Sequence, residues 1–378
     1  MAVGDKPYRV YRGGRAKGKV PLERPPRATS PPKAPPASKR RRRWWVWALL
    51  GFAGLAVLAL LWGILGFLSF SNGVDKANER LPRRAYNRLA TLDGSLLTTP
   101  ATTLVIGTDG STTPGRTNAR RADSLLLVRT DPGKHRITYL SIPRDLRVDI
   151  PGYGSGKINS ANQFGGPALT LATVRNLTGI PINHVVAVNF VGFRDLIDAL
   201  GGVDINVPKP ILSNPFDCPH SPKRCLTWKG WRFGKGMWHM DGRHALAYSR
   251  IRKNLLDPSE SDLTRTARQQ AVADAVGNKI ASFGTFLHLP FRGNSLASPL
   301  ATDLSAWELA KLGWVRFRAD SSHTLHCRLG GEPATIGGES VIIGGDDNAS
   351  VVSMFLGRSA PVAPAKGDLY APGCTRRR

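Results

Sequence analysis

The hydrophobic pattern of the chain has one uninterrupted apolar run, "WWVWALLGFAGLAVLALLWGILGFLSF", at residues 44–70. A helix of this length, at about 1.5 Å rise per residue, is longer than the ~30 Å hydrocarbon core of a bilayer. Tryptophans at its start suit the membrane interface. A signal peptide has a shorter apolar core, usually of about 7–15 residues, followed by a small-residue cleavage site. The run therefore predicts a transmembrane helix.

After this run the pattern changes to short apolar stretches that alternate with amphipathic ones. We expect a juxtamembrane helix and linker over residues 71–97, a folded domain over 98–358 and a C-terminal tail over 359–378. Strands are predicted at "TTLVIG", "DSLLLVRT", "HRITYLSIP", "VVAVN" and "VDINVP", and a "DPGK" turn joins the second to the third. Helices are predicted at "GPALTLATVRNLTG", "FVGFRDLIDALGG", "DGRHALAY" and "SDLTRTARQQAVADAVGNKIASF". This alternation predicts an α/β fold with a mixed central sheet flanked by helices.

The charge of the chain is concentrated before the apolar run. Residues 1–43 hold 14 Lys and Arg against Asp5 and Glu23, nearly half of the net charge of +26. This tail is rich in proline and should be disordered. Its last residues, "KRRRR", predict a cytoplasmic tail and a domain outside the membrane. The tail lacks interleaved aromatic residues and a folded DNA-binding motif, so topology and anionic lipids explain its charge better than nucleic acid does.

Four cysteines, all outside the apolar run and the tail, are candidates for disulfides. Cys218 and Cys225 lie in one loop, "FDCPHSPKRC", and a bond between Cys327 and Cys374 would tie the C-terminal tail to the body. The alternative is a zinc site using His220 or His326. The cysteine spacing fits no common zinc pattern, which favours disulfides.

The stretch "AYSRIRKN" places two arginines close together. If it is extended, Tyr248, Arg250 and Arg252 point to the same face, because side chains alternate along a strand. Neighbouring guanidinium groups repel each other unless an anion lies between them. Arginine suits bidentate contacts to phosphate, so the stretch indicates a phosphate or diphosphate site.

The long predicted helix turns polar residues inward at its start. At about 100° per residue, one stripe contains Arg265, Gln269, Val272, Val276, Ile280 and Phe283. The C-terminal part of this stripe is expected to be ordinary core. Arg268 lies on the flank. Arg265 either pairs with a carboxylate such as Asp195 or Asp198, or belongs to an anion pocket at the N-terminus of the helix, which Ser261 or Asp262 would cap.

Further charged residues follow or precede the predicted strands. Arg144 and Asp145, in "SIPRDLRV", come directly after a strand and form either part of a site or a surface turn. Asp109 follows a buried strand and Asp123 precedes the next one. Alone, each is explained as a turn or cap residue. Together, two carboxylates among several arginines are what a Mg²⁺–diphosphate complex needs.

These motifs, in this order, resemble the LytR–CpsA–Psr family of cell-wall glycopolymer ligases. The resemblance is carried by "VIGTDG", "RRADSLLLV", "YLSIPRDLRVDIPG", the segment from "GKINSANQFGG" to "DINVP", "HMDGRHALAYSRIRKN" and "DLTRTARQQ". It is dense over residues 98–283 and looser to about residue 357. The single apolar helix before the domain is also typical of the family.

The resemblance implies a phosphotransferase outside the cytoplasmic membrane that moves a glycopolymer from a polyprenyl diphosphate carrier to peptidoglycan. It implies Mg²⁺ (or Mn²⁺) at Asp109 and Asp123, and a lipid tunnel walled by the helices at residues 169–177 and 190–200. The residues it implies for diphosphate binding are Arg121, Arg144, Arg250, Arg252, Arg265 and Gln269. Asp145 and the two metal-site carboxylates are the candidates for a general base.

This sequence departs from the family pattern in two respects. Ser261 and Asp262 stand where the family often has Gly-Asp, and the two cysteine-containing loops are not core family features. The sequence leaves two other functions open. The domain is then either a non-catalytic module that binds a polyprenyl phosphate, or a diphosphatase in which water replaces the sugar hydroxyl. The glycopolymer, the acceptor position and the oligomeric state are not defined by the sequence.

Overall fold

The computed structural model describes Gly13, residues 44–110, 121–257, Glu260 and residues 262–376. Apart from Gly13, the predicted disordered tail lies outside the described residues, and so does the predicted cap Ser261. The chain divides into two units, residues 1–54 and 55–378. The second contains the sheet and all the predicted site residues.

The apolar run forms the first part of a longer helix, α1 (Trp44–Arg80). Among the described residues, α1 is the one helix long and apolar enough to cross a membrane. It continues past the predicted end at residue 70, so the first part of the predicted juxtamembrane helix is a continuation of α1. Its last turns pack on the domain: a Cβ on Gly73 would lie 2.8 Å from the Cα of Asn294. Pro82 then separates α1 from the short helix α2 (Arg83–Tyr86).

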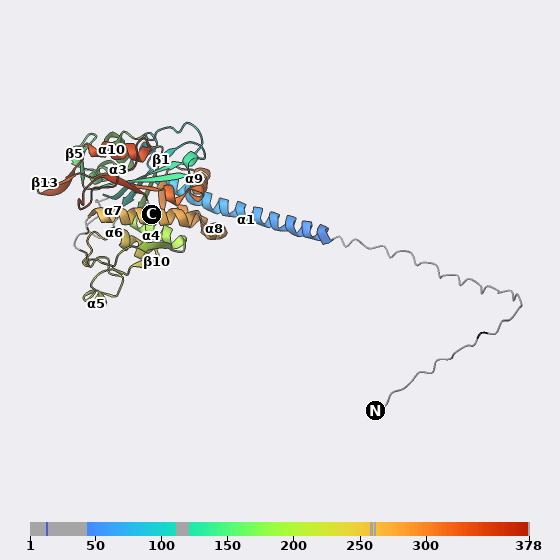
Figure 1. The fold of residues 1–378 in the computed structure, drawn as a ribbon. Coiled ribbons are helices and arrows are strands. Elements are labelled where there is room, and N and C mark those ends of the chain that lie inside the picture. The colour runs from blue at the N-terminus through green and yellow to red at the C-terminus, as the bar shows by residue number, and fades with distance from the viewer. Residues whose placement is uncertain (1–12, 14–43, 111–120, 258–259, 261, 377–378) are drawn as a thin grey trace, which may run out of the picture. The chain divides into compact units, whose positions relative to one another are not determined.

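A seven-stranded mixed sheet forms the centre of the domain (Figure 1), as the sequence predicts. Its strands, in spatial order, are β11 (Leu300–Thr302), β6 (His184–Asn189), β1 (Ala101–Thr108), β2 (Ala122–Asp131), β3 (Arg136–Ile142), β12 (Leu325–Arg328) and β15 (Gly373–Arg376). The pairs β1–β6 and β3–β12 are parallel, and the other neighbours are antiparallel. The predicted "DPGK" turn is confirmed: it is a 3₁₀ turn, η1 (Pro132–Lys134), in which the Asp131 side chain accepts from the Lys134 N–H.

The alternation of side chains along β1 and β2 creates two different faces. Leu104 of β1 and Leu125 and Leu127 of β2 belong to a core that α3 (Asn159–Thr178) and α10 (Asp347–Leu356) complete. Val105 and Leu126 point to the opposite face, toward α7 (Asp262–Ile280) and α9 (Ala306–Arg318). Because side chains alternate along each strand, one face of the sheet packs in a filled core and the other face lines a cavity.

Beyond α7, a second core is built from α4 (Phe190–Ala199), α6 (Gly242–Arg250) and the two-stranded sheet of β7 (Val203–Val207) and β10 (Gly236–Met240). The predicted long helix ends at Ile280. Phe283, which was expected on the same stripe, instead begins a separate helix, α8 (Phe283–Ala297), with Ser282 as its N-cap. The stripe prediction is therefore wrong beyond Ile280, because the Ser282 hydroxyl accepts from the Thr285 N–H and starts a new helix.

The remaining elements cover the edges of the domain. A four-stranded sheet has the order β13 (Glu332–Ile336), β14 (Glu339–Ile343), β4 (Leu146–Ile150) and β5 (Gly154–Lys157). The smaller elements are β8 (Ile211–Leu212), α5 (Pro222–Cys225), β9 (Arg232–Phe233) and η2 (Ser321–His323). The four cysteines form the disulfides Cys218–Cys225 and Cys327–Cys374, the second between neighbouring strands β12 and β15.

Candidate functional site

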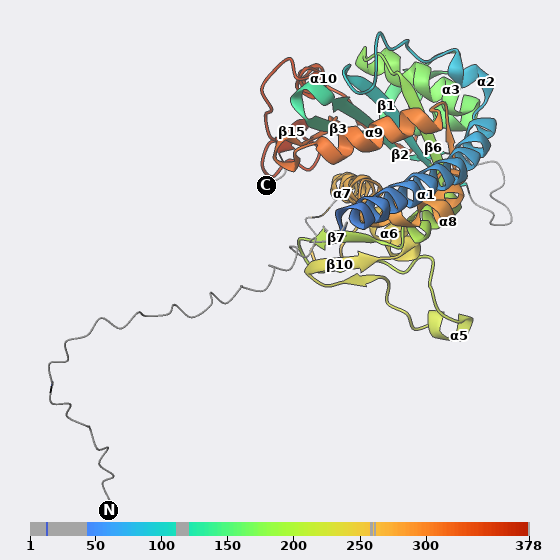
Figure 2. The same cartoon turned by 90° about the vertical axis from the view of Figure 1, so that its right-hand side faces the viewer.

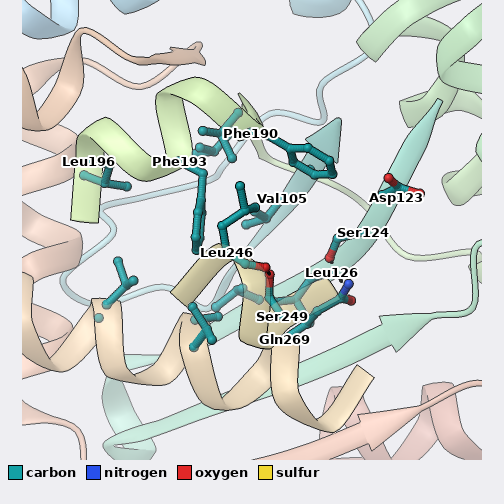
Figure 3. Close-up of a pocket in the computed structure, with 18 of the residues that line it drawn as sticks. Val105, Asp123, Ser124, Leu126, Phe190, Phe193, Leu196, Leu246, Ser249 and Gln269 are labelled. Atoms are coloured by element: carbon teal, nitrogen blue, oxygen red, sulfur yellow. Dashed lines mark hydrogen bonds between the residues drawn. The ribbon is translucent and has the colours of Figure 1, made fainter. Parts of the chain in front are cut away.

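A cavity of about 720 Å³ lies between the sheet and the helices α4, α6, α7 and α9. Its wall is mostly apolar, with Val105 and Leu126 from the sheet and Phe193 and Leu196 from α4, as Figure 3 shows. The volume is within the ~300–1,000 Å³ range of ligand-binding pockets. The lining also contains a group of polar and charged residues: Asp123, Ser124, Ser249, Arg250, Arg252, Lys253, Arg265 and Gln269.

Helix α7 relates the polar and apolar parts of the cavity. Arg265 and Gln269, in its first turns, line the polar part, and Val276 and Ile280, in its last turns, line the apolar part. From Arg265 to Ile280 the helix rises about 20 Å. The C-terminal part of the stripe was expected to be ordinary core. Val272 and Val276 do pack in the second core, and together with Ile280 they also line this cavity. The cavity is thus elongated and amphipathic. Arg265 and Gln269 line one end, and the charge of Arg316, which also lines it, is paired with Asp274.

The stretch "AYSRIRKN" is not an extended strand. It is helical to Arg250, the last residue of α6, and leaves the helix only at Ile251. Asp241 caps α6 by accepting from the His244 N–H, as predicted for the preceding segment. The strand prediction for Tyr248, Arg250 and Arg252 is therefore wrong: Tyr248 is buried in the second core, whereas Arg250 and Arg252 line the cavity. The two arginines line the same cavity because α6 ends at Arg250 and the chain leaves the helix there, not because side chains alternate along a strand.

The guanidinium group of Arg250 is held by one acidic and two aromatic side chains. It pairs with Asp217 and lies 4.5 Å from the ring centroid of Phe190 and 5.3 Å from that of Phe216. A cation above an aromatic face is attracted by the ring quadrupole. These contacts fix a positive charge beside the phenylalanines of the cavity wall, where it is suited to meet an anion.

Arg265 is buried, and Gln269 joins α7 to the sheet. The Gln269 side-chain oxygen accepts from the Ser124 hydroxyl at 3.1 Å, a contact visible in Figure 3. Asp195 and Asp198, considered as partners of Arg265, line a different hollow, and Asp198 accepts from the Gly242 N–H at 2.8 Å. The inward orientation predicted for the start of this helix is present.

Arg144 and Asp145 belong to a charged chain that leads from the cavity to the four-stranded sheet. Arg144 lies 2.6 Å from Asp123 and 3.3 Å from Asp145, and Asp145 lies 3.6 Å from Lys157. All of these side chains are at most one quarter exposed. Arg144 is thus linked to the cavity through Asp123 without lining it.

Asp109 and Asp123 lie at the same end of the neighbouring antiparallel strands β1 and β2. Thr108, the last residue of β1, is opposite Ala122, so Asp109 comes directly after that pair and Asp123 within β2. Two carboxylates are an all-oxygen donor set that suits Mg²⁺, which commonly takes further ligands from phosphate and water. Among the described residues, no group of three or more His, Cys, Asp and Glu is placed to hold a metal. Asp109 and Asp123 thus supply the type of donor atom that such a cation takes.

Arg121, like Arg144, is a predicted diphosphate ligand that does not line the cavity. It is exposed, does not line the cavity, and donates through Nε to the side-chain oxygen of Gln163 on α3 at 3.0 Å. Arg121 precedes β2, which carries Asp123, so it lies at the same sheet end but outside the cavity wall.

Of the two helices predicted to wall the tunnel, one lines the cavity and the other does not. Helix α4, within residues 190–200, contributes Phe190, Phe193 and Leu196 to the cavity. The helix at residues 169–177 does not: Leu171 and Val174 of α3 pack on the opposite face of the sheet. The wall attributed to that segment is formed by α9, with Leu309 and Leu312, a helix that was not predicted.

Sequence reasoning missed several residues around the cavity. Lys253 and Phe216 line it, and so does Arg316, which pairs with Asp274 at 2.5 Å. Arg268 was placed only on the flank of the helix, yet it is buried, pairs with Glu260 at 2.7 Å and donates to the Ile251 carbonyl. The charge run "RIRKN" contained a signal for Lys253. The other three depend on contacts distant in sequence.

The chain is similar to known proteins in sequence and in structure. The LytR_cpsA_psr family model matches residues 65–352. The polyisoprenyl-teichoic acid–peptidoglycan teichoic acid transferase TagU of Halalkalibacterium halodurans is 33% identical over 69% of this chain and 80% of its own length. The crystal structure of B. subtilis TagV matches with a TM-score of 0.56 and 28% identity, over 68% of this chain and 96% of that one. The family protein YwtF (TagT) with bound octaprenyl pyrophosphate lipid matches with a TM-score of 0.52 and 25% identity, over 71% and 93% of the two chains.

Proposed function

Because the chain belongs to the LytR–CpsA–Psr family, we propose that it is a membrane-anchored phosphotransferase that moves a glycopolymer from a polyprenyl diphosphate carrier to peptidoglycan. The relatives named as teichoic acid transferases support the transfer of a glycopolymer. The solved relative that holds octaprenyl pyrophosphate supports the class of the donor.

The observation that carries this proposal is the amphipathic cavity. A polyprenyl diphosphate has a long apolar chain and a charged head, and the cavity has an apolar part and a cationic part about 20 Å apart along α7. Arg250, Arg252 and Arg265 line the cationic part together with Lys253. A water-soluble sugar phosphate would make no use of the apolar length.

In the proposed reaction, a sugar hydroxyl of peptidoglycan attacks the phosphorus that carries the glycopolymer. A new P–O bond forms, the P–O bond of the diphosphate bridge breaks, and polyprenyl phosphate leaves with the bonding electron pair. The hydroxyl proton passes to a carboxylate, for which Asp109, Asp123 and Asp145 are the candidates. Phosphoryl transfer of this kind depends mainly on positioning and charge neutralisation.

The arginines neutralise the charge that grows on the leaving phosphate. We assign Arg250, Arg252 and Arg265 to the diphosphate, with Gln269 as a hydrogen-bonding partner beside them. Arg144 acts from the Asp123 side of the cavity, and we assign to Asp145 the positioning of Arg144, with which it is paired. Arg121 would contact the part of the donor that projects from the cavity.

Asp109 and Asp123 would hold Mg²⁺ or Mn²⁺ in the loaded enzyme. When bound, such an ion supplies positive charge to the diphosphate oxygens. The pairing of Asp123 with Arg144 keeps this carboxylate oriented toward the same end of the sheet.

We also propose the orientation of the chain in the membrane. The basic tail, which ends in "KRRRR", lies in the cytoplasm, and the domain lies outside. This side holds the peptidoglycan acceptor and favours the two disulfides. No step of the proposed reaction involves nucleic acid.

The test replaces two of the cavity arginines, Arg250 and Arg252, in the full-length chain, reconstituted in vesicles that contain the lipid-linked donor. With Mg²⁺ and peptidoglycan fragments present, the Arg250→Ala/Arg252→Ala variant should transfer glycan at least about 100-fold more slowly, because removing one charge-stabilising donor typically lowers rates 10²–10³-fold. The control is Arg243→Ala, an exposed arginine of the same helix that does not line the cavity.

Each outcome of this assay decides between functions. Unchanged transfer by the double variant would refute the assigned role of the two arginines. Donor cleavage at the same rate with and without peptidoglycan, giving free glycan phosphate, would identify a diphosphatase. Donor binding without cleavage under any condition would identify a non-catalytic lipid-binding module.

A further inference from the structure

Helix α8 exposes a row of phenylalanines. Phe283 and Phe291 are 73% and 74% exposed, and Phe286 between them is 48% exposed. At about 100° per residue the three rings fall within an arc of about 140° on the helix. A single exposed apolar residue is ordinary, but a row of large ones on one helix face indicates a surface that contacts something apolar.

Helix α9 exposes a second row. Trp307, Trp314 and Phe317 are 61%, 53% and 65% exposed and fall on one side of the helix, seven and three residues apart. The other side of the same helix lines the cavity through Leu309 and Leu312. Helix α9 therefore has exposed aromatic residues on one side and the apolar part of the cavity on the other.

Both rows are continuous with the apolar surface of α1. Phe291 of α8 packs against Trp62 with ring centroids 5.5 Å apart, and Trp307 of α9 packs against Phe67 at 6.2 Å. Figures 1 and 2 show both helices beside the C-terminal part of α1. Counted from Trp44, the ~20 residues that cross the hydrocarbon core end near Ile64, between these two contacts. The rows thus meet α1 at the depth where the membrane surface is expected.

The charges around the rows suit an anionic membrane surface. Helix α8 contains Arg292 and no acidic residue. Helix α9 contains Lys311 and Arg318 against Glu308, besides Arg316, which is paired with Asp274 at the cavity. Basic residues beside a membrane are attracted to anionic headgroups, and tryptophan and tyrosine are enriched at the membrane interface.

We propose that these six residues, the aromatic rim (Phe283, Phe286, Phe291, Trp307, Trp314 and Phe317), form a membrane-contacting surface in the outer leaflet interface. The occupant of this surface is the lipid bilayer that α1 crosses. The rim then holds the domain against the membrane, with the apolar part of the cavity facing it, instead of leaving the domain to move freely on its anchor. This inference goes beyond the proposed transfer reaction and does not depend on it.

Photocrosslinking in the full-length chain tests the proposal. A benzophenone amino acid is placed at Phe286 or at Phe317, and the protein is reconstituted in vesicles of phosphatidylethanolamine and phosphatidylglycerol. The control position is Tyr153, which is 57% exposed and belongs to the turn between β4 and β5. Irradiation should give lipid adducts at least tenfold more often from the two rim positions than from Tyr153.

Two results would overturn the proposal. One is an equal yield of lipid adducts at all three positions. The other is crosslinking of the rim mainly to a second copy of the chain, which would make the rim a protein interface. Because the measurement needs no turnover, a failed transfer assay with rim adducts present would refute the proposed function and leave the rim intact.

Discussion

At the residue scale, His326 is a half-buried base with no role in the proposed reaction. It stacks on the Tyr139 ring at 5.1 Å and its Nδ1 lies 3.1 Å from the Gln270 side-chain oxygen. Burial, and then the positive charge of Arg316, lower the pKa of His326 to about 4. In the unfolded chain a histidine has a pKa of about 6.5, so the unfolded state binds a proton that the folded state excludes.

The pH dependence of stability follows from this difference. The contribution of His326 is complete above about pH 6.5 and is lost as the pH falls toward 4. We predict that the free energy of unfolding falls by about 2–3 kcal/mol more in the native chain than in His326→Gln between pH 7.5 and pH 4.5. Urea unfolding of both proteins at the two pH values measures it. Equal losses in the two proteins would show that His326 is protonated in the folded state.

The types of residue in the sequence predicted the site, but they did not predict the individual contacts between side chains. The arginines were predicted because clustered guanidinium groups imply an anion, and Arg250, Arg252 and Arg265 do line one cavity. The ion pair of Arg268 with Glu260 was not predictable, because it depends on how the segment after α6 folds back over α7. Long-range pairs of this kind carry no local signal.

At the element scale, two of the cavity walls depend on a glycine. Gly242, the first residue of α6, touches the backbone of α4: a Cβ there would clash with the Arg194 carbonyl oxygen and lie 2.7 Å from the Arg194 Cα. A backbone contact cannot give way as a side-chain end can. Gly242→Ala should therefore lower the free energy of unfolding by about 1–3 kcal/mol and reduce transfer by displacing α6, which carries Arg250.

A second glycine near a helix start provides the control. A Cβ added to Gly284, in the first turn of α8, would meet only the Ser282 hydroxyl, at 3.9 Å. Gly284→Ala should change the free energy of unfolding by no more than about 0.5 kcal/mol. Thermal or urea unfolding of the two variants measures the difference. Equal stability of the two variants would mean that α4 and α6 separate without penalty.

Elements with a strong local pattern were predicted, and those with a weak one were not. The strands β1, β2, β3, β6 and β7 and the helices α4, α6 and α7 have clear apolar periods and turn or cap signals. The end of α6 was mistaken because "AYSRIRKN" alternates like a strand, whereas the helix capped at Asp241 continues to Arg250. The face of the sheet that α3 covers depends on the connection between elements, which periodicity does not encode.

At the scale of the whole molecule, the sequence predicted the class and missed how its parts combine. A mixed sheet and an apolar anchor follow from composition and alternation. That α1 extends into the domain and packs against α8 depends on Gly66 and Gly73, whose close contacts with Leu289 and Asn294 appear only in three dimensions. The aromatic rim was hidden for the same reason, since exposed and buried phenylalanines look alike in a sequence.

The two disulfides hold the molecule together over very different lengths of chain. Cys218–Cys225 closes a loop with a separation of 7 residues, and Cys327–Cys374 closes one with a separation of 47 and fastens the edge strand β15 to β12. A cross-link stabilises mainly by removing freedom from the unfolded chain, and the effect grows with loop length. The chain-entropy relation gives about 2.5 kcal/mol for the short loop and about 4 kcal/mol for the long one.

Replacing each pair with alanine should therefore rank the two bonds. We predict a clearly larger loss of unfolding free energy for Cys327→Ala/Cys374→Ala than for Cys218→Ala/Cys225→Ala, measured by denaturant titration of the full-length chain. Burial strengthens this order, because Cys327 and Cys374 are within the main core, where removed sulfur atoms leave space that the neighbours fill only in part. The opposite order would mean that β15 contributes little to the cooperative unit, and that the C-terminal segment unfolds independently of the sheet that carries the cavity.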